Sequence, residues 1–118
     1  MIADDAKFMA TITERLLKKM GHEIVFKAHN GEEAVQYFEQ HGNTVDLILL
    51  DVVMPKMDGL QALRHILAID PRAKVIMVTA ISNTSIVTGA MRVGAREFVT
   101  KPFRLSEFVR AINKVIEL

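Results

Sequence analysis

Residues 45–55 read Val-Asp-Leu-Ile-Leu-Leu-Asp-Val-Val-Met-Pro, and this stretch decides the fold. Four aliphatic residues run without a polar break between Asp46 and Asp51. A short apolar run of this kind is typical of a β-strand that is buried on both faces. Asp51 stands where that strand ends, and in open parallel sheets ligands collect at the carboxyl ends of the strands. The stretch alone leaves two interpretations open: Asp51 begins a loop, or it is a functional carboxylate.

Strand and helix patterns alternate along the whole chain. The first expected helix carries Phe8, Ile12, Leu16 and Met20 at i, i+4 spacing, which is typical of a helix, and Gly21 ends it. Asn30 followed by Glu33 has the form of a capping box. The expected strands are residues 1–4, 23–28, 46–52, 74–79 and 97–100, and the expected helices are residues 7–20, 31–41, 60–69, 84–93 and 106–117.

This alternation predicts one α/β domain over residues 1–118. Strands that alternate with helices of this length imply right-handed crossovers and a parallel sheet covered on both faces. Five such units indicate a flavodoxin-like (βα)5 fold with strand order 2-1-3-4-5. The strand that should be central, residues 1–4, is short, and we expect it to be a shortened version of the usual first strand.

Composition excludes several classes of protein. The net charge is +1, with 15 basic and 14 acidic side chains, so nothing favours nucleic-acid binding overall. The absence of cysteine excludes a disulfide framework and a thiolate metal site. No apolar run approaches the roughly 20 residues of a membrane span, and the first residues do not form a signal peptide. We expect a cytoplasmic protein that neither enters a membrane nor binds nucleic acid.

Polar residues follow the strands that should lie together. Asp4 and Asp5 stand at the end of the first strand, Asp51 at the end of the third, Thr79 at the end of the fourth and Lys101 at the end of the fifth. Because parallel strands end at one edge of the sheet, we expect these side chains to converge. Each alone has a structural explanation, such as a helix cap or a surface lysine, but their joint placement does not.

Three neighbouring carboxylates repel one another unless protons or a cation compensate their charge. Mg²⁺ suits such a site because it prefers hard oxygen ligands and is commonly held by carboxylates together with phosphate. Lys101 supplies a point charge and Thr79 a hydroxyl for phosphoryl oxygens. These groups are the components of phosphoryl transfer to a carboxylate, which yields an acyl phosphate.

Four segments of the sequence resemble motifs of a known protein family. The relevant segments are Asp4-Asp5, Asp51 with Met54-Pro-Lys-Met-Asp-Gly59, Thr79-Ala80 and Lys101-Pro102-Phe103. With them the chain resembles, over essentially its whole length, the receiver domain of two-component response regulators, and among these the single-domain, CheY-like chemotaxis type. The resemblance implies that Asp51 accepts a phosphoryl group from a sensor histidine kinase.

The resemblance also assigns the remaining site residues. It implies that Asp5, Asp51 and the backbone carbonyl of Val53 ligate Mg²⁺, while Asp4 acts through a metal-bound water. It implies that the phosphoryl oxygens are bound by Lys101, Thr79 and the backbone amide of Ala80. The Lys101–Pro102 peptide bond is expected to be cis. The protein is then not an enzyme in the usual sense, because it only gains and loses its own phosphoryl group.

A switch follows from the same resemblance. Thr79 is expected to move toward the phosphoryl group, and Phe98 to move inward behind it. The surface formed by residues 84–117 then changes its affinity for a downstream effector protein or output domain. Relatives often have Tyr at the position of Phe98, and Phe lacks the hydroxyl that could bond a partner. We expect a monomer.

Two positions beside the predicted acyl phosphate are apolar. Val53 and Ile81 lie two residues after Asp51 and Thr79, where the side chains of relatives influence hydrolysis. Neither can orient an attacking water, so we expect slow autodephosphorylation.

Other functions fit less well. A haloacid-dehalogenase-like phosphatase needs a second Asp where the chain has Val53. A dinucleotide-binding protein needs a glycine-rich turn where the chain has Asp4-Asp5. The complete set of acids, Thr79 and Lys101 argues against an interaction module that is never phosphorylated. A receiver cut from a multidomain transcription factor remains open. The four histidines show no metal-ligand spacing.

Overall fold

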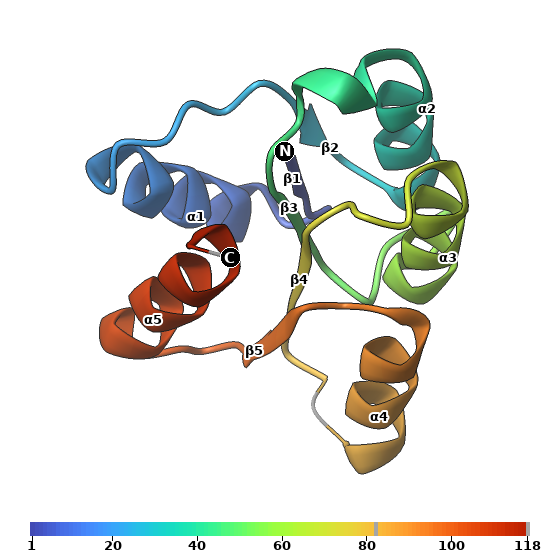
Figure 1. Cartoon of the computed structure of the whole chain (residues 1–118). Helices are drawn as coiled ribbons and strands as arrows, with labels where there is room; N and C mark the ends of the chain where they lie inside the picture. The colour runs from blue at the N-terminus through green and yellow to red at the C-terminus, as the bar shows by residue number, and fades with distance from the viewer. Residues whose placement is uncertain (82, 118) are drawn as a thin grey trace.

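The computed structural model, which describes residues 1–81 and 83–117, has the predicted alternation of strands and helices (Figure 1). Five parallel strands form one sheet in the order β2-β1-β3-β4-β5, which confirms the flavodoxin-like prediction. The elements are β1 (Ile2–Ala3), α1 (Lys7–Lys19), β2 (Lys27–Ala28), α2 (Gly31–His41), η1 (Gly42–Thr44), β3 (Ile48–Leu50), α3 (Gly59–Ile69), β4 (Val75–Thr79), α4 (Thr84–Val93), β5 (Glu97–Thr100) and α5 (Leu105–Ile116).

Helices cover both faces of the sheet. Helices α2, α3 and α4 lie on one face, and α1 and α5 lie on the other (Figure 1). The apolar side chains accordingly form two core clusters, one on each face. Within the described residues, none of these helices is long and apolar enough to cross a membrane.

Strand β3 explains the unbroken apolar run of the sequence. Successive side chains of a strand point to opposite faces. Ile48 and Leu50 therefore enter the core cluster under α2 and α3, whereas Leu49 enters the cluster under α1 and α5. All three residues are at most 2 % exposed. The strand is buried on both faces, and its end is a rigid support for Asp51.

Side-chain caps fix the starts of three helices on one face. The Asn30 side chain accepts a hydrogen bond of 2.9 Å from the backbone amide of Glu33, as the capping box predicts. Asp58 and Asn83 accept equivalent bonds of 2.9 Å at the starts of α3 and α4. Each cap satisfies an amide that has no partner within its helix.

The buried face of α1 does not coincide with the i, i+4 series of apolar residues. Phe8 is 75 % exposed, and the buried residues of the helix are Ala10, Thr13 and Leu17. An α-helix turns by about 100° per residue, so a series at i, i+4 drifts by about 40° at each step. Leu16 and Met20, later in the series, pack at the edge of the core, whereas the drift carries Phe8 toward solvent.

Several strands are shorter than their sequence patterns. Residues 23–28 were expected to form a strand, but only Lys27 and Ala28 pair with β1. Strand β1 is itself only Ile2–Ala3, in accordance with the expected short first strand. A strand can extend only as far as its neighbour offers backbone partners. The expected strand 46–52 is likewise reduced to Ile48–Leu50.

Candidate functional site

The three acidic residues meet at the carboxyl edge of the sheet. Ala3 in β1 is paired with Leu50 in β3, so the residues that follow them, Asp4 and Asp51, lie side by side. The backbone amide of Asp51 donates a hydrogen bond of 3.0 Å to the carbonyl of Ala3. One carboxylate oxygen of each of Asp4, Asp5 and Asp51 lies within 4.8 Å of the others. The sequence prediction that these acids converge is confirmed.

Lys101 joins two of these carboxylates. Its ammonium Nζ lies 2.7 Å from Asp4 Oδ2 and 3.1 Å from Asp51 Oδ2. Burial opposes the charge on Lys101, but the two carboxylates outweigh it and hold the pKa of the lysine above its usual value. The ammonium therefore stays charged at neutral pH. The Lys101–Pro102 bond is cis, as the resemblance implied.

The carboxylates of Asp4 and Asp51 differ in how firmly they are held. Both Asp4 oxygens accept close bonds, one at 2.9 Å from the backbone amide of Ala6 and one from Lys101. Asp51 accepts longer bonds, from Lys101 and, at 3.3 Å, from the backbone amide of Val53. Asp4 and Asp51 are buried, whereas Asp5 is exposed. Of the two buried acids, Asp51 is the one whose oxygens are less fully engaged.

Thr79 lies at the end of β4, beside this cluster in the sheet. Its side chain is 1 % exposed, and its hydroxyl oxygen accepts a bond of 3.3 Å from the backbone amide of Ile81. The backbone amide of Lys101 donates to the carbonyl of Thr79 at 2.8 Å, which connects the ends of β4 and β5. Ala80, next in the chain, is exposed.

The two apolar residues predicted to flank the site are exposed. Val53 is 54 % exposed and Ile81 is 38 % exposed, although both have aliphatic side chains. They stand two residues after Asp51 and Thr79, on the loops that leave β3 and β4. Neither side chain carries a group that could accept a proton from water.

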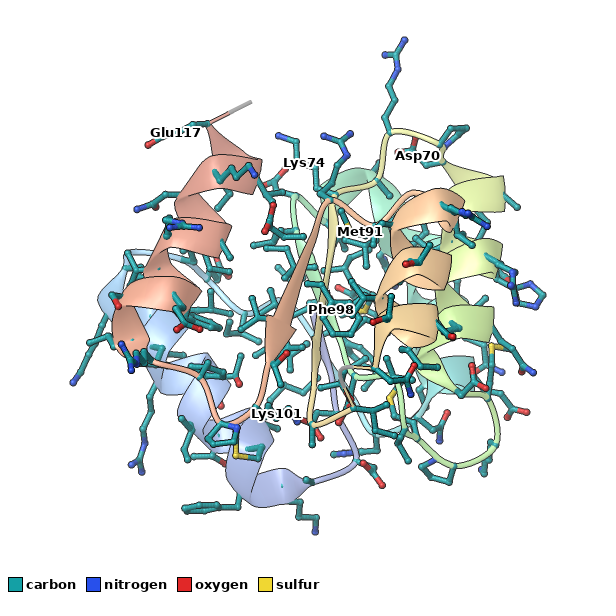
Figure 2. All side chains as sticks on the ribbon, turned by 90° about the horizontal axis from the view of Figure 1, so that it is seen from below. Asp70, Lys74, Met91, Phe98, Lys101 and Glu117 are labelled. Carbon is teal, nitrogen blue, oxygen red and sulfur yellow. The ribbon has the colours of Figure 1, made fainter. Side chains whose placement is uncertain are left out.

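Phe98 is partly buried in β5, opposite Met77 of β4. Both residues belong to the core cluster on the α2–α3–α4 face. Thr79 is two residues beyond Met77 on the same strand, so its side chain points to that same face. Figure 2 shows Phe98 beside α4, and Lys101 farther along the chain where β5 ends. The two predicted switch residues therefore lie on one face of the sheet.

Gly59 is the last residue of the segment Met54-Pro-Lys-Met-Asp-Gly59, and the sequence alone assigned it no role of its own. Its amide donates a bond of 2.7 Å to the carbonyl of Val52. A Cβ atom at this position would lie 1.9 Å from the carbonyl oxygen of Asp51. Only glycine therefore allows the start of α3 to come this close to Asp51. The Asp-Gly signal was present in the sequence, but the close contact depends on the fold.

The donor set fits a divalent cation. Three carboxylates facing one lysine leave a net charge of −2 at the cluster. Hard oxygen ligands with this excess charge suit Mg²⁺, which often keeps several waters when one or two carboxylates bind it. The exposure of Asp5 leaves the cluster open to such an ion from solvent.

Comparisons with known proteins agree with this geometry. The model of the response regulator receiver domain family matches residues 1–113. Chemotaxis protein CheY of Bacillus subtilis is 40% identical over 98% of this chain and 95% of that protein, and CheY of Thermotoga maritima is 38% identical over 98% and 94%. A chain in the crystal structure of the CheX-CheY-BeF3-Mg²⁺ complex from Borrelia burgdorferi superposes with a TM-score of 0.94 and 32% identity, over 97% of this chain and 85% of that one.

Mg²⁺ is expected to stabilise the folded protein by binding to the cluster of Asp4, Asp5 and Asp51. At a concentration of 100 times the Kd, binding to the native state alone adds about 2.7 kcal/mol to the free energy of unfolding. Thermal denaturation with and without Mg²⁺ measures this effect. Asp5→Asn should remove most of this stabilisation, because it deletes one of the three carboxylate groups of the cluster, the exposed one.

The matched control is Asp46→Asn, which changes an exposed acid beyond the other end of β3. It should retain the full response to Mg²⁺. Equal stabilisation of Asp5→Asn and Asp46→Asn would contradict the assignment of the metal site.

Proposed function

The chain belongs to the family of response regulator receiver domains, and we propose that it accepts a phosphoryl group on Asp51 from a sensor histidine kinase. The reaction depends on Mg²⁺. The phosphorylated protein then signals to a downstream effector protein or output domain through the surface of α4, β5 and α5. Similarity to chemotaxis proteins supports a role in chemotaxis.

The single observation that carries this proposal is the position of Lys101 between Asp4 and Asp51. A lysine held between two carboxylates can release one of them and bind a phosphoryl oxygen in its place. Asp51 is the better nucleophile of the pair, because its hydrogen bonds are longer than those of Asp4. A carboxylate with less engaged oxygens retains more of its nucleophilic character.

The proposed transfer needs little chemistry beyond positioning. An oxygen of Asp51 attacks the phosphorus of a phosphohistidine, and the new O–P bond forms as the N–P bond breaks and the imidazole keeps the electron pair. Lys101, the Thr79 hydroxyl and the backbone amide of Ala80 bind the phosphoryl oxygens. Beyond this phosphorylation and its hydrolysis, we assign the protein no enzymatic activity.

The metal ion compensates the negative charge of the phosphoryl group and the carboxylates during phosphoryl transfer. We assign its ligands to Asp5, Asp51 and the backbone carbonyl of Val53. Asp4 contributes through a metal-bound water. The cluster of Asp4, Asp5 and Asp51 supports this assignment, since each offers a carboxylate oxygen within 4.8 Å of the others.

The proposed switch follows from the shared face of Thr79 and Phe98. When the hydroxyl of Thr79 turns toward the phosphoryl group, it vacates space beside β5, and Phe98 moves inward. The phosphoryl group shifts the equilibrium only through contacts that differ between the two conformations. Because Phe98 lacks a hydroxyl, its contribution is packing rather than a hydrogen bond to the partner.

We place this signalling in the cytoplasm and expect the protein to act as a monomer. The domain that carries it comprises residues 1–118, whether it acts alone or as the receiver of a longer protein. We assign no nucleic-acid binding and no membrane insertion to this chain, in line with its net charge of +1.

Incubation with Mg²⁺ and a small acyl phosphate is expected to place one phosphoryl group on the protein. Treatment with acid or with hydroxylamine should remove the phosphoryl group, as the reactivity of an acyl phosphate requires. Asp51→Asn should abolish the labelling, whereas Asp46→Asn should leave it unchanged. Absence of labelling, or unchanged labelling of Asp51→Asn, would contradict the proposal and favour an interaction module that is never phosphorylated.

The acyl phosphate is expected to decay slowly in the absence of other proteins, because Val53 and Ile81 cannot orient water. Val53→Asn should speed the decay about tenfold, since one hydrogen bond to the attacking water is worth about 1.4 kcal/mol of barrier. Val53→Ala is the control, because it shortens the side chain without adding a polar group. The time course of label loss measures the rate, and rapid decay that Val53→Asn does not alter would disprove the role of this position.

Phe98→Trp provides a probe of the switch, because the chain has no tryptophan. Its fluorescence emission is expected to shift on phosphorylation as the ring becomes more buried. Thr79→Val keeps the shape of the side chain but removes its hydroxyl, so it should abolish the shift while Asp51 is still labelled. A fluorescence shift that persists when Thr79→Val is combined with Phe98→Trp would show that residue 98 moves independently of Thr79.

A further inference from the structure

Helix α2 contacts the loop that follows the phosphorylation site. This loop, residues 54–58, is the second part of the connection between β3 and α3, and it contains Lys56 at a φ of 66°. Gly31, the first residue of α2, donates its backbone amide to the carbonyl of Met57 at 3.0 Å. The first amides of a helix have no partner within the helix. The loop therefore supplies a partner that α2 needs, and α2 supplies a fixed attachment for the loop.

The contact tolerates no side chain on Gly31. A Cβ atom there would lie 2.2 Å from the carbonyl oxygen of Met57 and 2.8 Å from its carbonyl carbon. Non-bonded atoms pack at about 3.5–4.0 Å, so one of the two backbones would have to move by about 1 Å. The backbone of Gly31 is helical, so an alanine could adopt its conformation. Glycine is needed here for the close approach alone.

Neighbouring contacts make α2 the more rigid of the two partners. Asn30 caps the helix, and Glu33 bonds back to the amide of His29 at 3.0 Å. The loop is anchored at its two ends, by the buried side chain of Met54 and by the Asp58 cap of α3. Between these anchors the backbone makes one bond within the loop, from the amide of Met57 to the carbonyl of Pro55 at 2.7 Å. A clash at Gly31 would therefore displace the middle of the loop, which lacks the repeated bonds of a helix.

We propose that Gly31 is a positioning residue for the phosphorylation site, which acts by holding the loop after Asp51 in place. The inference rests on the proposed function, because the loop follows both Asp51 and the Val53 carbonyl assigned to the metal. A displacement of about 1 Å at a reacting centre can cost about 100-fold in rate. Gly31 itself touches neither the metal nor the phosphoryl group in this assignment.

Gly31→Ala tests the proposal. The variant should bind Mg²⁺ more weakly than the wild type and be phosphorylated at least about tenfold more slowly. Gly89→Ala is the matched control, because it adds the same methyl group in α4, where the described residues place no atom within 4 Å of the new Cβ apart from its chain neighbours and the backbone of the helix itself. Ile112→Val controls for lost stability, since it removes a methyl group from the core under the opposite face. Both controls should react and bind Mg²⁺ as the wild type does.

A second readout needs neither metal nor phosphate. In the metal-free protein, Gly31→Ala should speed hydrogen exchange at the amides of Met57 and Gly59, whose bonds hold the loop. If Gly31→Ala does not fold, the wild-type protein still tests the role of Gly31. Titration with Mg²⁺ alone should then shift the amide resonance of Gly31 but not that of Gly89.

The outcomes separate the two proposals. A folded Gly31→Ala variant could be labelled, bind Mg²⁺ and exchange its loop amides as the wild type does. That result would overturn the role of Gly31 and leave the phosphorylation of Asp51 intact. A Gly31 resonance that does not respond to Mg²⁺ while that of Gly59 does would overturn it as well. Failure of the wild type to be labelled would instead contradict the proposed function, and the exchange measurement would still report on the loop.

Discussion

The bridge from Lys101 to Asp4 and Asp51 is the interaction on which the rest of the site depends. Two buried carboxylates side by side would repel each other strongly, and removing the cation between them would cost about 3–5 kcal/mol. The bridge connects the ends of β1, β3 and β5, which are far apart in the sequence. It also leaves the cluster with two uncompensated negative charges, and this excess is what makes a divalent cation and an incoming phosphoryl group chemically reasonable there.

The parallel sheet makes this bridge possible. Strand β3 is held by apolar contacts on both faces, so Asp51 projects from a rigid support rather than from a free loop. The loops around it are held by contacts that only glycine permits, with Gly59 against the carbonyl of Asp51 and Gly31 against that of Met57. The buried strand below the site and the close backbone contacts beside it would keep the reacting groups in position during the proposed phosphorylation of Asp51.

The sequence was sufficient to predict the fold and the convergence of Asp4, Asp5, Asp51 and Lys101, because strand alternation fixes which chain ends share an edge. The sequence did not show which face of α1 is buried, because the regular spacing of Phe8 with later residues does not coincide with the direction of the sheet. It also could not indicate Gly31 or Gly59 as more than turn and cap residues. Their importance arises from contacts between segments that only the folded chain brings together.

The central claim is that Asp51 is the residue that carries the phosphoryl group. Borohydride reduction of the phosphorylated protein, followed by mass spectrometry of its peptides, tests this claim most directly, because an aspartyl phosphate is reduced to homoserine. Our account predicts homoserine at position 51 and unmodified aspartate at positions 4 and 5. Homoserine at either of those two positions, with Asp51 unmodified, would contradict it.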